Sequence, residues 1–111
     1  MVVCLPVTAE GLIDPRWGKA QRVVVASVGG DGVGAWQEYE VGWDVLHDAG
    51  TEGSHHARIA RFVLDHGVEA VVAGHMGPPM VNMLQRMGVK VTLEAAGSAR
   101  AAATLAVGRA G

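Results

Sequence analysis

The residues of this sequence best suited to bind a ligand form one short loop, Gly74-His75-Met76-Gly77-Pro78-Pro79. A β-branched apolar run at 70–73 precedes the loop, and an amphipathic stretch at 79–87 follows it. A loop between a buried strand and a helix points backbone N–H groups and the positive end of the helix dipole into a cleft, where an anion binds. The prolines lack N–H groups, so this loop has fewer donors than a phosphate-binding loop. We expect Gly74, His75, Met76 and Gly77 to contact a cofactor.

Histidines are the candidate metal ligands, because imidazole coordinates iron, copper or zinc. His75 in the loop is the first candidate, and an exposed loop histidine is the alternative. His55 and His56 open a helix predicted over about 54–66, where adjacent side chains point about 100° apart. At most one of them is then expected to face the same cleft as His75. The alternative is that both side chains are solvated. His47 and His66 lack ligand-like spacing, so a closed zinc site is not expected.

A short basic and aromatic segment lies between the first two predicted strands and contains Arg16, Trp17 and Lys19. It begins at the end of the first strand, where Thr8 emerges. If the segment folds over the cleft, a cation neutralises a bound anion and Trp17 covers it, so we include all four residues in the candidate cofactor site. The alternative is that Trp17 fills the edge of the core while the charges stay in water.

Methionines recur at positions 76, 80, 83 and 87. Thioethers are soft ligands for copper(I), but a stripe at helical spacing is more often core. We therefore assign Met80, Met83 and Met87 to the core and leave Met76 as a soft neighbour of His75. Cys4 lies within a predicted strand and is expected to be a small buried hydrophobe.

Length and composition narrow the class of protein. The 111 residues are half apolar and carry a net charge of −2, which predicts one globular domain over residues 1–111 and disfavours a nucleic-acid partner. A single cysteine cannot form an internal disulfide, no signal segment opens the chain, and no apolar run reaches the roughly 20 residues of a membrane span. A cytoplasmic location without a membrane partner is expected.

Hydrophobic periodicity predicts the order β-β-β-α-β-α-β-α. A hairpin turn at 29–32 joins the second and third strands, Thr51 or Ser54 caps the first helix, and Gly67 ends it. Residues 108–111 are expected to fray. Strands are predicted at 2–7, 21–28, 35–43, 70–73 and 89–93, and helices at about 54–66, 79–87 and 98–107.

This order resembles the ribonuclease-H-like topology, a mixed five-stranded sheet with helices on both faces. Within it, three segments are similar to the dinitrogenase iron-molybdenum cofactor biosynthesis family, whose members carry or process metal–sulfur clusters. The resemblance spans residues 2–105 and rests on the order and spacing of the segments. They are Asp14-Pro-Arg-Trp-Gly-Lys-Ala20, Phe62-Val-Leu-Asp-His-Gly-Val-Glu-Ala-Val-Val72, and the 74–79 loop with Leu84-Gln-Arg-Met-Gly-Val-Lys-Val91.

The resemblance implies a non-catalytic binding or carrier domain for an anionic metal–sulfur cluster, such as an iron-molybdenum cluster, with cofactor-assembly proteins as partners and a monomer or weak homodimer as its state. A two-metal nuclease is disfavoured, because it needs several carboxylates near the first and fourth strands, where this chain offers Cys4, Thr8 and His75. An enzyme acting on a small phosphorylated substrate lacks a visible nucleophile and base.

A metal-free interaction or regulatory module is the other class of function that the sequence leaves open. In the predicted third strand Trp36, Glu38 and Glu40 share one face, while Tyr39, Val41 and Trp43 share the other. Aromatic residues on an exposed face of the meander are suitable anchors for a second chain.

Overall fold

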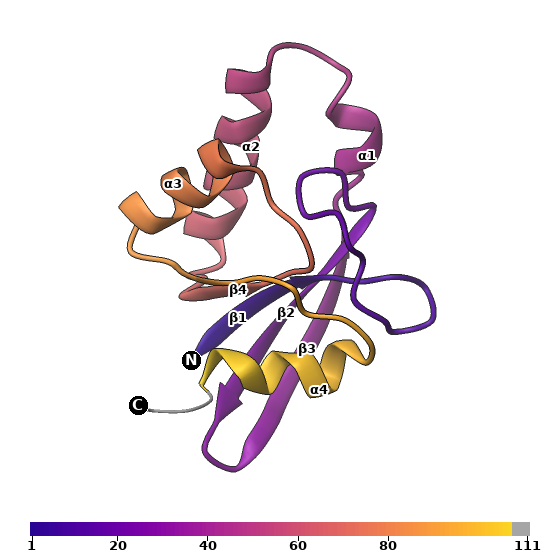
Figure 1. Cartoon of the computed structure of the whole chain (residues 1–111), viewed down its shortest axis with the longest axis vertical. Helices are drawn as coiled ribbons and strands as arrows, with labels where there is room; N and C mark the ends of the chain where they lie inside the picture. Colours follow the sequence, from indigo (N-terminus) through magenta and orange to yellow (C-terminus); the bar gives the residue numbers. More distant parts are fainter. Residues whose placement is uncertain (108–111) are drawn as a thin grey trace.

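The computed structural model of the chain describes residues 1–107, so the fraying expected at 108–111 concerns residues outside that range. Strands and helices follow one another in nearly the predicted order (Figure 1). They are β1 (Val2–Pro6), β2 (Arg22–Gly29), β3 (Gly32–Glu40), α1 (Trp43–Leu46), α2 (Glu52–Asp65), β4 (Ala70–Val72), α3 (Pro78–Arg86), β5 (Lys90–Thr92) and α4 (Ala99–Ala103), which continues as the 3-10 turn η1 (Thr104–Ala106).

The strands form one mixed sheet in the order β3-β2-β1-β4-β5. β1, β2 and β3 pair antiparallel, whereas β4 pairs parallel with both β1 and β5. The parallel pairs require crossover connections, which α2 and α3 supply. The predicted mixed five-stranded α/β fold is confirmed.

Each face of the sheet carries its own hydrophobic core, because alternate strand residues point to opposite sides. In β1, Val3 and Leu5 face the core under α4, while Cys4 faces the core under α2 and α3. All three side chains are fully buried. Figure 1 shows α2 and α3 on one side of the sheet and α4 on the other. None of the helices in residues 1–107 is long and apolar enough to cross a lipid bilayer.

The third strand is where the predicted pattern is wrong. It ends at Glu40 instead of residue 43, because Gly42 takes a left-handed φ of 62° and the chain turns into α1, a helix that the sequence analysis did not predict. Trp43 opens that helix and is 2% exposed. It packs edge-on against Trp17, with ring centroids 5.1 Å apart.

The aromatic residues of the meander are therefore less exposed than predicted, and Trp43 is buried. Trp36 is half-buried on the α4 side, where the guanidinium of Arg100 lies 4.6 Å from its ring centroid. Tyr39 faces the opposite side and packs against Phe62 and His66 of the α2 segment. Trp36 and Tyr39 are thus partly buried against the two cores, although five of the nine residues of β3 are exposed.

The start of α2 shows which of the two predicted caps is used. The Ser54 N–H donates to Thr51 Oγ1 at 3.0 Å, and the Thr51 N–H donates to Ser54 Oγ at 3.1 Å. Thr51 is thus the N-cap, and the helix begins two residues before the predicted start. Its far end agrees with prediction, since Gly67 has a φ of 62°.

Candidate functional site

Two loops predicted to form the site are joined through their backbones. The Arg16 segment and the His75 segment form a parallel β-bridge, in which the His75 N–H donates to the Pro15 carbonyl at 2.9 Å. The Asp14 carboxylate accepts from the Arg16 N–H at 2.9 Å and is itself buried, so it fixes the start of the first loop. The structure thus brings together residues that lie almost 60 positions apart in the sequence.

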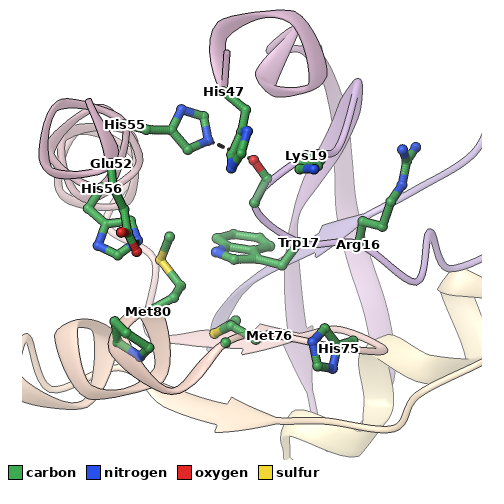
Figure 2. Close-up of a pocket in the computed structure, with 13 residues that line it drawn as sticks. Arg16, Trp17, Lys19, His47, Glu52, His55, His56, His75, Met76 and Met80 are labelled. Atoms are coloured by element: carbon green, nitrogen blue, oxygen red, sulfur yellow. Dashed lines mark hydrogen bonds and ion pairs between the residues drawn. The ribbon is translucent and has the colours of Figure 1, made fainter. Parts of the chain in front are cut away.

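A cavity of about 260 Å³ opens between these loops and the start of α2 (Figure 2). We call it the site cavity. The first loop supplies one wall, α2 a second, and the loop into α3 a third. The residues that line it are Arg16, Trp17, Gly18, Lys19, His47, Glu52, His55, His56, His75, Met76, Gly77, Pro79 and Met80.

Most of the candidate site residues lie on this cavity. They are Arg16, Trp17, Lys19, His75, Met76, Gly77, His55 and His56. Thr8 does not line the cavity; its hydroxyl accepts from the Leu12 N–H at 3.2 Å, which closes a separate turn. Gly74 does not line it either. A role in binding stays a prediction for all of these residues.

Gly74 has a steric reason to be glycine. A Cβ built on it would lie 3.0 Å from the Pro15 Cα and 3.3 Å from the Ala95 carbonyl oxygen. Both are backbone atoms, so neither neighbour can rotate away. Gly74 therefore allows the two loops of the cavity to approach each other closely.

The cavity is electrically polarised. Arg16 and Lys19 are exposed at one side, and the Arg16 side chain is 58% exposed with its Nε 3.4 Å from Asp14 Oδ1. On the α2 side the Glu52 carboxylate lies 3.9 Å from the Nε2 of His56. One side is thus suited to an anion, and the other to a cation.

The first turn of α3 does not offer the N–H donors that the sequence analysis assigned to it. Pro78 and Pro79 have none, and the N–H groups of Met80 and Val81 both donate to the Gly77 carbonyl at 3.1 Å. The first helical residues therefore lack the expected free N–H groups, while anion binding by the Gly77 N–H stays a prediction. The helix instead presents an apolar edge of proline and methionine to the cavity.

His55 is 3% exposed and has a protein partner at each ring nitrogen. Its Nδ1 lies 2.8 Å from Nη1 of Arg58, and because a guanidinium can only donate, Nδ1 is the acceptor. Its Nε2–H then donates to the Gly18 carbonyl at 2.6 Å (Figure 2). The ring is therefore neutral and fastens the first loop to α2, and in this arrangement it has no nitrogen free for a metal.

His56 lines the same cavity one residue further along α2, with a side chain 24% exposed, so the expectation that at most one of the two adjacent histidines would reach the cleft is wrong. No hydrogen bond to its ring is found within residues 1–107; the contact to Glu52 is longer than a hydrogen bond. Of the two adjacent histidines, His56 is thus the one with an available ring nitrogen.

Trp17 forms the floor of the cavity and is 1% exposed. Its indole Nε1–H is buried and has no hydrogen-bond partner within the described chain. A buried donor without an acceptor costs about 1–3 kcal/mol, so this N–H group is an exception among the buried polar groups of the described chain. Trp17 both fills the core, beside Trp43, and lines the site.

The sequence analysis missed several cavity residues for identifiable reasons. His47 reaches the cavity because α1 follows β3, and its ring centroid lies 5.1 Å from that of His55. Met80 was assigned only to the core, yet it is both buried there and part of the cavity wall. Glu52 lies outside the predicted helix but belongs to α2, which begins at that residue. The Gly42 break after a strand was the available signal for α1.

Within residues 1–107, no three His, Cys, Asp or Glu side chains are placed to bind one metal ion. Cys4 is fully buried in β1, and burial raises the pKa of its thiol far above the ordinary value. It therefore stays protonated and away from the cavity.

The family model described as dinitrogenase iron-molybdenum cofactor matches residues 1–108. The chain belongs to the dinitrogenase iron-molybdenum cofactor family. This confirms the resemblance inferred from the three segments. No curated protein matches the sequence.

Several solved structures have the same fold as this chain at low sequence identity. The crystal structure of PH0822 is similar with a TM-score of 0.72 and 19% identity, over 91% of this chain and 85% of that one. The apo form of the orange protein from Desulfovibrio gigas has a TM-score of 0.71 and 23% identity, over 91% and 82%. A candidate NifB protein from Thermotoga, assigned to the DUF35 family, has 0.66 and 21%, over 91% and 82%. These likenesses support the fold alone.

Proposed function

We propose that this protein binds and carries an anionic metal–sulfur cluster in the site cavity, without catalysing a reaction on it. The observation that carries the proposal is the buried indole N–H of Trp17, which has no partner in residues 1–107 and lies at the wall of a cavity edged by Arg16 and Lys19. Membership of the iron-molybdenum cofactor family supports the identity of the cargo.

The lining residues fit a soft anion better than a hard one. Exposed cations at Arg16 and Lys19 attract negative charge, and the Trp17 N–H donates one hydrogen bond. The thioethers of Met76 and Met80 add polarisable apolar surface, which suits sulfide ligands. Phosphate would need several backbone donors, and the first turn of α3 provides none to the cavity.

The cluster would arrive preformed, because the described chain has no exposed thiolate to build or ligate it. Cys4 is buried, and no other cysteine exists in the sequence. His75, exposed at the cavity edge, would supply a coordination or ionic contact. Capture in a reducing cytoplasm and transfer to cofactor-assembly proteins complete the proposal, with the protein acting as a monomer or weak homodimer.

Binding of tetrathiomolybdate, a simple molybdenum–sulfur dianion, tests the proposal under anaerobic conditions, with molybdate as the oxygen counterpart. The double variant Arg16→Gln/Lys19→Gln should weaken tetrathiomolybdate binding by up to about thirtyfold, since each exposed charge contributes up to about 1 kcal/mol. His75→Ala should weaken it further. Arg61→Gln/Arg86→Gln removes the same charge elsewhere and is the matched control. Equal affinity of all variants, or tighter binding of molybdate, would refute the proposal.

A matched pair of variants tests the role of the Trp17 indole. Trp17→Phe keeps an aromatic ring in the core but removes the donor, so the affinity for tetrathiomolybdate should fall by about tenfold or more, the value of a hydrogen bond to a charged group. Trp36→Phe makes the same change on the opposite face of the sheet and should leave the affinity unchanged. A Trp17→Phe variant with wild-type affinity would show that the indole N–H contacts no ligand.

A further inference from the structure

The site cavity also carries side chains of types that bind a metal ion directly: two thioethers and one imidazole. Met76 and Met80 are 6% and 5% exposed, yet both line the cavity, and His56 lines it from α2. Figure 2 shows the Met80 sulfur between the His56 ring and the Trp17 indole, with Met76 below the indole. Two thioethers and one imidazole thus line the same cavity: His56 from α2, Met80 from the first turn of α3, and Met76 from the loop before it.

The chemistry of this set is specific. Thioether sulfur is a soft, neutral donor that binds copper(I) and binds hard divalent ions poorly. Imidazole is also a ligand for copper(I). His56 has a ring nitrogen without a hydrogen bond in the described chain, whereas both ring nitrogens of His55 are engaged. A ligand position is therefore available at His56 and closed at His55.

Charge at this end of the cavity favours a cation. The Glu52 carboxylate lies 3.9 Å from the His56 Nε2, and both residues line the cavity. A zinc or iron site would need further His, Cys, Asp or Glu side chains, and residues 1–107 hold no cluster of three. The available donors thus select a soft monovalent ion over a divalent one.

We propose that Met76, Met80 and His56 form a site for one soft monovalent d10 cation, of the copper(I) class, at the α2 side of the cavity. Such an ion lies apart from Arg16 and Lys19, which are at the other loop. Met76 and Met80 serve both proposals, but here they act with His56 as direct metal ligands, so the site goes beyond the cluster-binding proposal and does not require it.

Titration of the purified full-length chain with copper(I), buffered by a chromophoric copper(I) chelator under anaerobic conditions, tests the site. Silver(I) serves as a second probe that undergoes no redox chemistry. Wild type should bind one equivalent, and Met76→Leu, Met80→Leu and His56→Gln should each weaken binding by about tenfold or more. Leucine has nearly the volume of methionine, so the variants should fold, which thermal unfolding checks.

Met83→Leu and Met87→Leu are matched controls, because these methionines do not line the cavity but a neighbouring groove, which His56 and Pro79 also line. Both controls should bind copper(I) as wild type does. Labelled methionine methyl groups give a direct NMR readout, in which silver(I) should shift the signals of Met76 and Met80 and leave those of Met83 and Met87 in place. Wild-type affinity in Met76→Leu/Met80→Leu, or zinc binding as tight as copper(I) binding, would overturn the proposal.

The Arg16→Gln/Lys19→Gln variant separates the two proposals. It should keep or strengthen copper(I) binding, since it removes positive charge from the cavity, while it loses tetrathiomolybdate. A chain that binds copper(I) but no thiometalate would support the cation site and refute cluster carriage. The reverse result would refute the cation site alone.

Discussion

Substitution of Gly74 by alanine is the sharpest test of how the two loops of the cavity fit together. The added Cβ would meet the Pro15 Cα at 3.0 Å and the Ala95 carbonyl oxygen at 3.3 Å. Neither segment is free to withdraw. Pro15 accepts from the His75 N–H at 2.9 Å, and the Ala95 N–H donates to the Ala73 carbonyl at 3.1 Å.

The expected cost follows from two opposing terms. Forcing a methyl group into packed backbone destabilises a protein by about 1–3 kcal/mol. Alanine also restricts the unfolded chain, which returns about 0.4–1 kcal/mol. We therefore expect Gly74→Ala to lower the free energy of unfolding by about 1–2 kcal/mol, which corresponds to a Tm lower by roughly 4–8 °C for a domain of this size.

Gly77→Ala is the matched control in the same loop. Gly77 has a φ of −70°, which alanine adopts readily, and its added Cβ would meet Pro79 Cδ at 3.9 Å, an ordinary contact. Its Tm should equal that of wild type or exceed it slightly. Thermal unfolding followed by circular dichroism compares the variants. If Gly74→Ala and Gly77→Ala melt at the same temperature, the steric account of Gly74 is wrong.

Three further changes test other parts of the structure, each by urea unfolding. Burial raises the pKa of the Cys4 thiol, so the folded state holds the proton more tightly than the unfolded state, whose thiol titrates near 9.0. Above that pH the free energy of unfolding should fall by about 1.4 kcal/mol per pH unit more in wild type than in Cys4→Val, and parallel curves would contradict this. His55→Leu leaves the Gly18 carbonyl and Arg58 without their ring partner and should cost about 2–3 kcal/mol; a loss below about 0.5 kcal/mol would mean that the ring does not fasten the loop. Thr51→Ala removes the cap of α2 and should cost about 1 kcal/mol, whereas no loss would place the helix start elsewhere.

Strand order and helix positions could be predicted from the sequence because they depend on local pattern. The run at 70–73 is apolar on both faces, as a strand between two helical layers must be, and Gly67 and Gly88 end α2 and α3 at positive φ. Trp43 shows the limit of this reasoning. Its residue type fits the period-2 pattern of β3. The chain turns at Gly42, which has a positive φ, so Trp43 begins α1 instead of extending the strand.

The position of the cavity could be predicted from the sequence, but the contacts of its side chains could not. Parallel pairing of β1 with β4 places the loops that follow both strands at one edge of the sheet, so the meeting of Arg16 with His75 was foreseeable. Which nitrogen of His55 is engaged depends on Arg58, a partner set by packing and not by spacing. The same holds for Met80, whose assignment to the core followed its helical spacing and overlooked the hollow beside it.

The two prolines that open α3 also bear on how quickly a ligand exchanges. A cage of backbone N–H groups holds an oxyanion through several directional bonds, and Pro78 and Pro79 remove that possibility from this edge. An anion here is held mainly by exposed side-chain charges, which speed encounter and are weakened by salt, while short-range bonds that slow departure are few. The cavity should therefore fill and empty rapidly, and residence time should shorten with ionic strength, as the proposed carrier function requires.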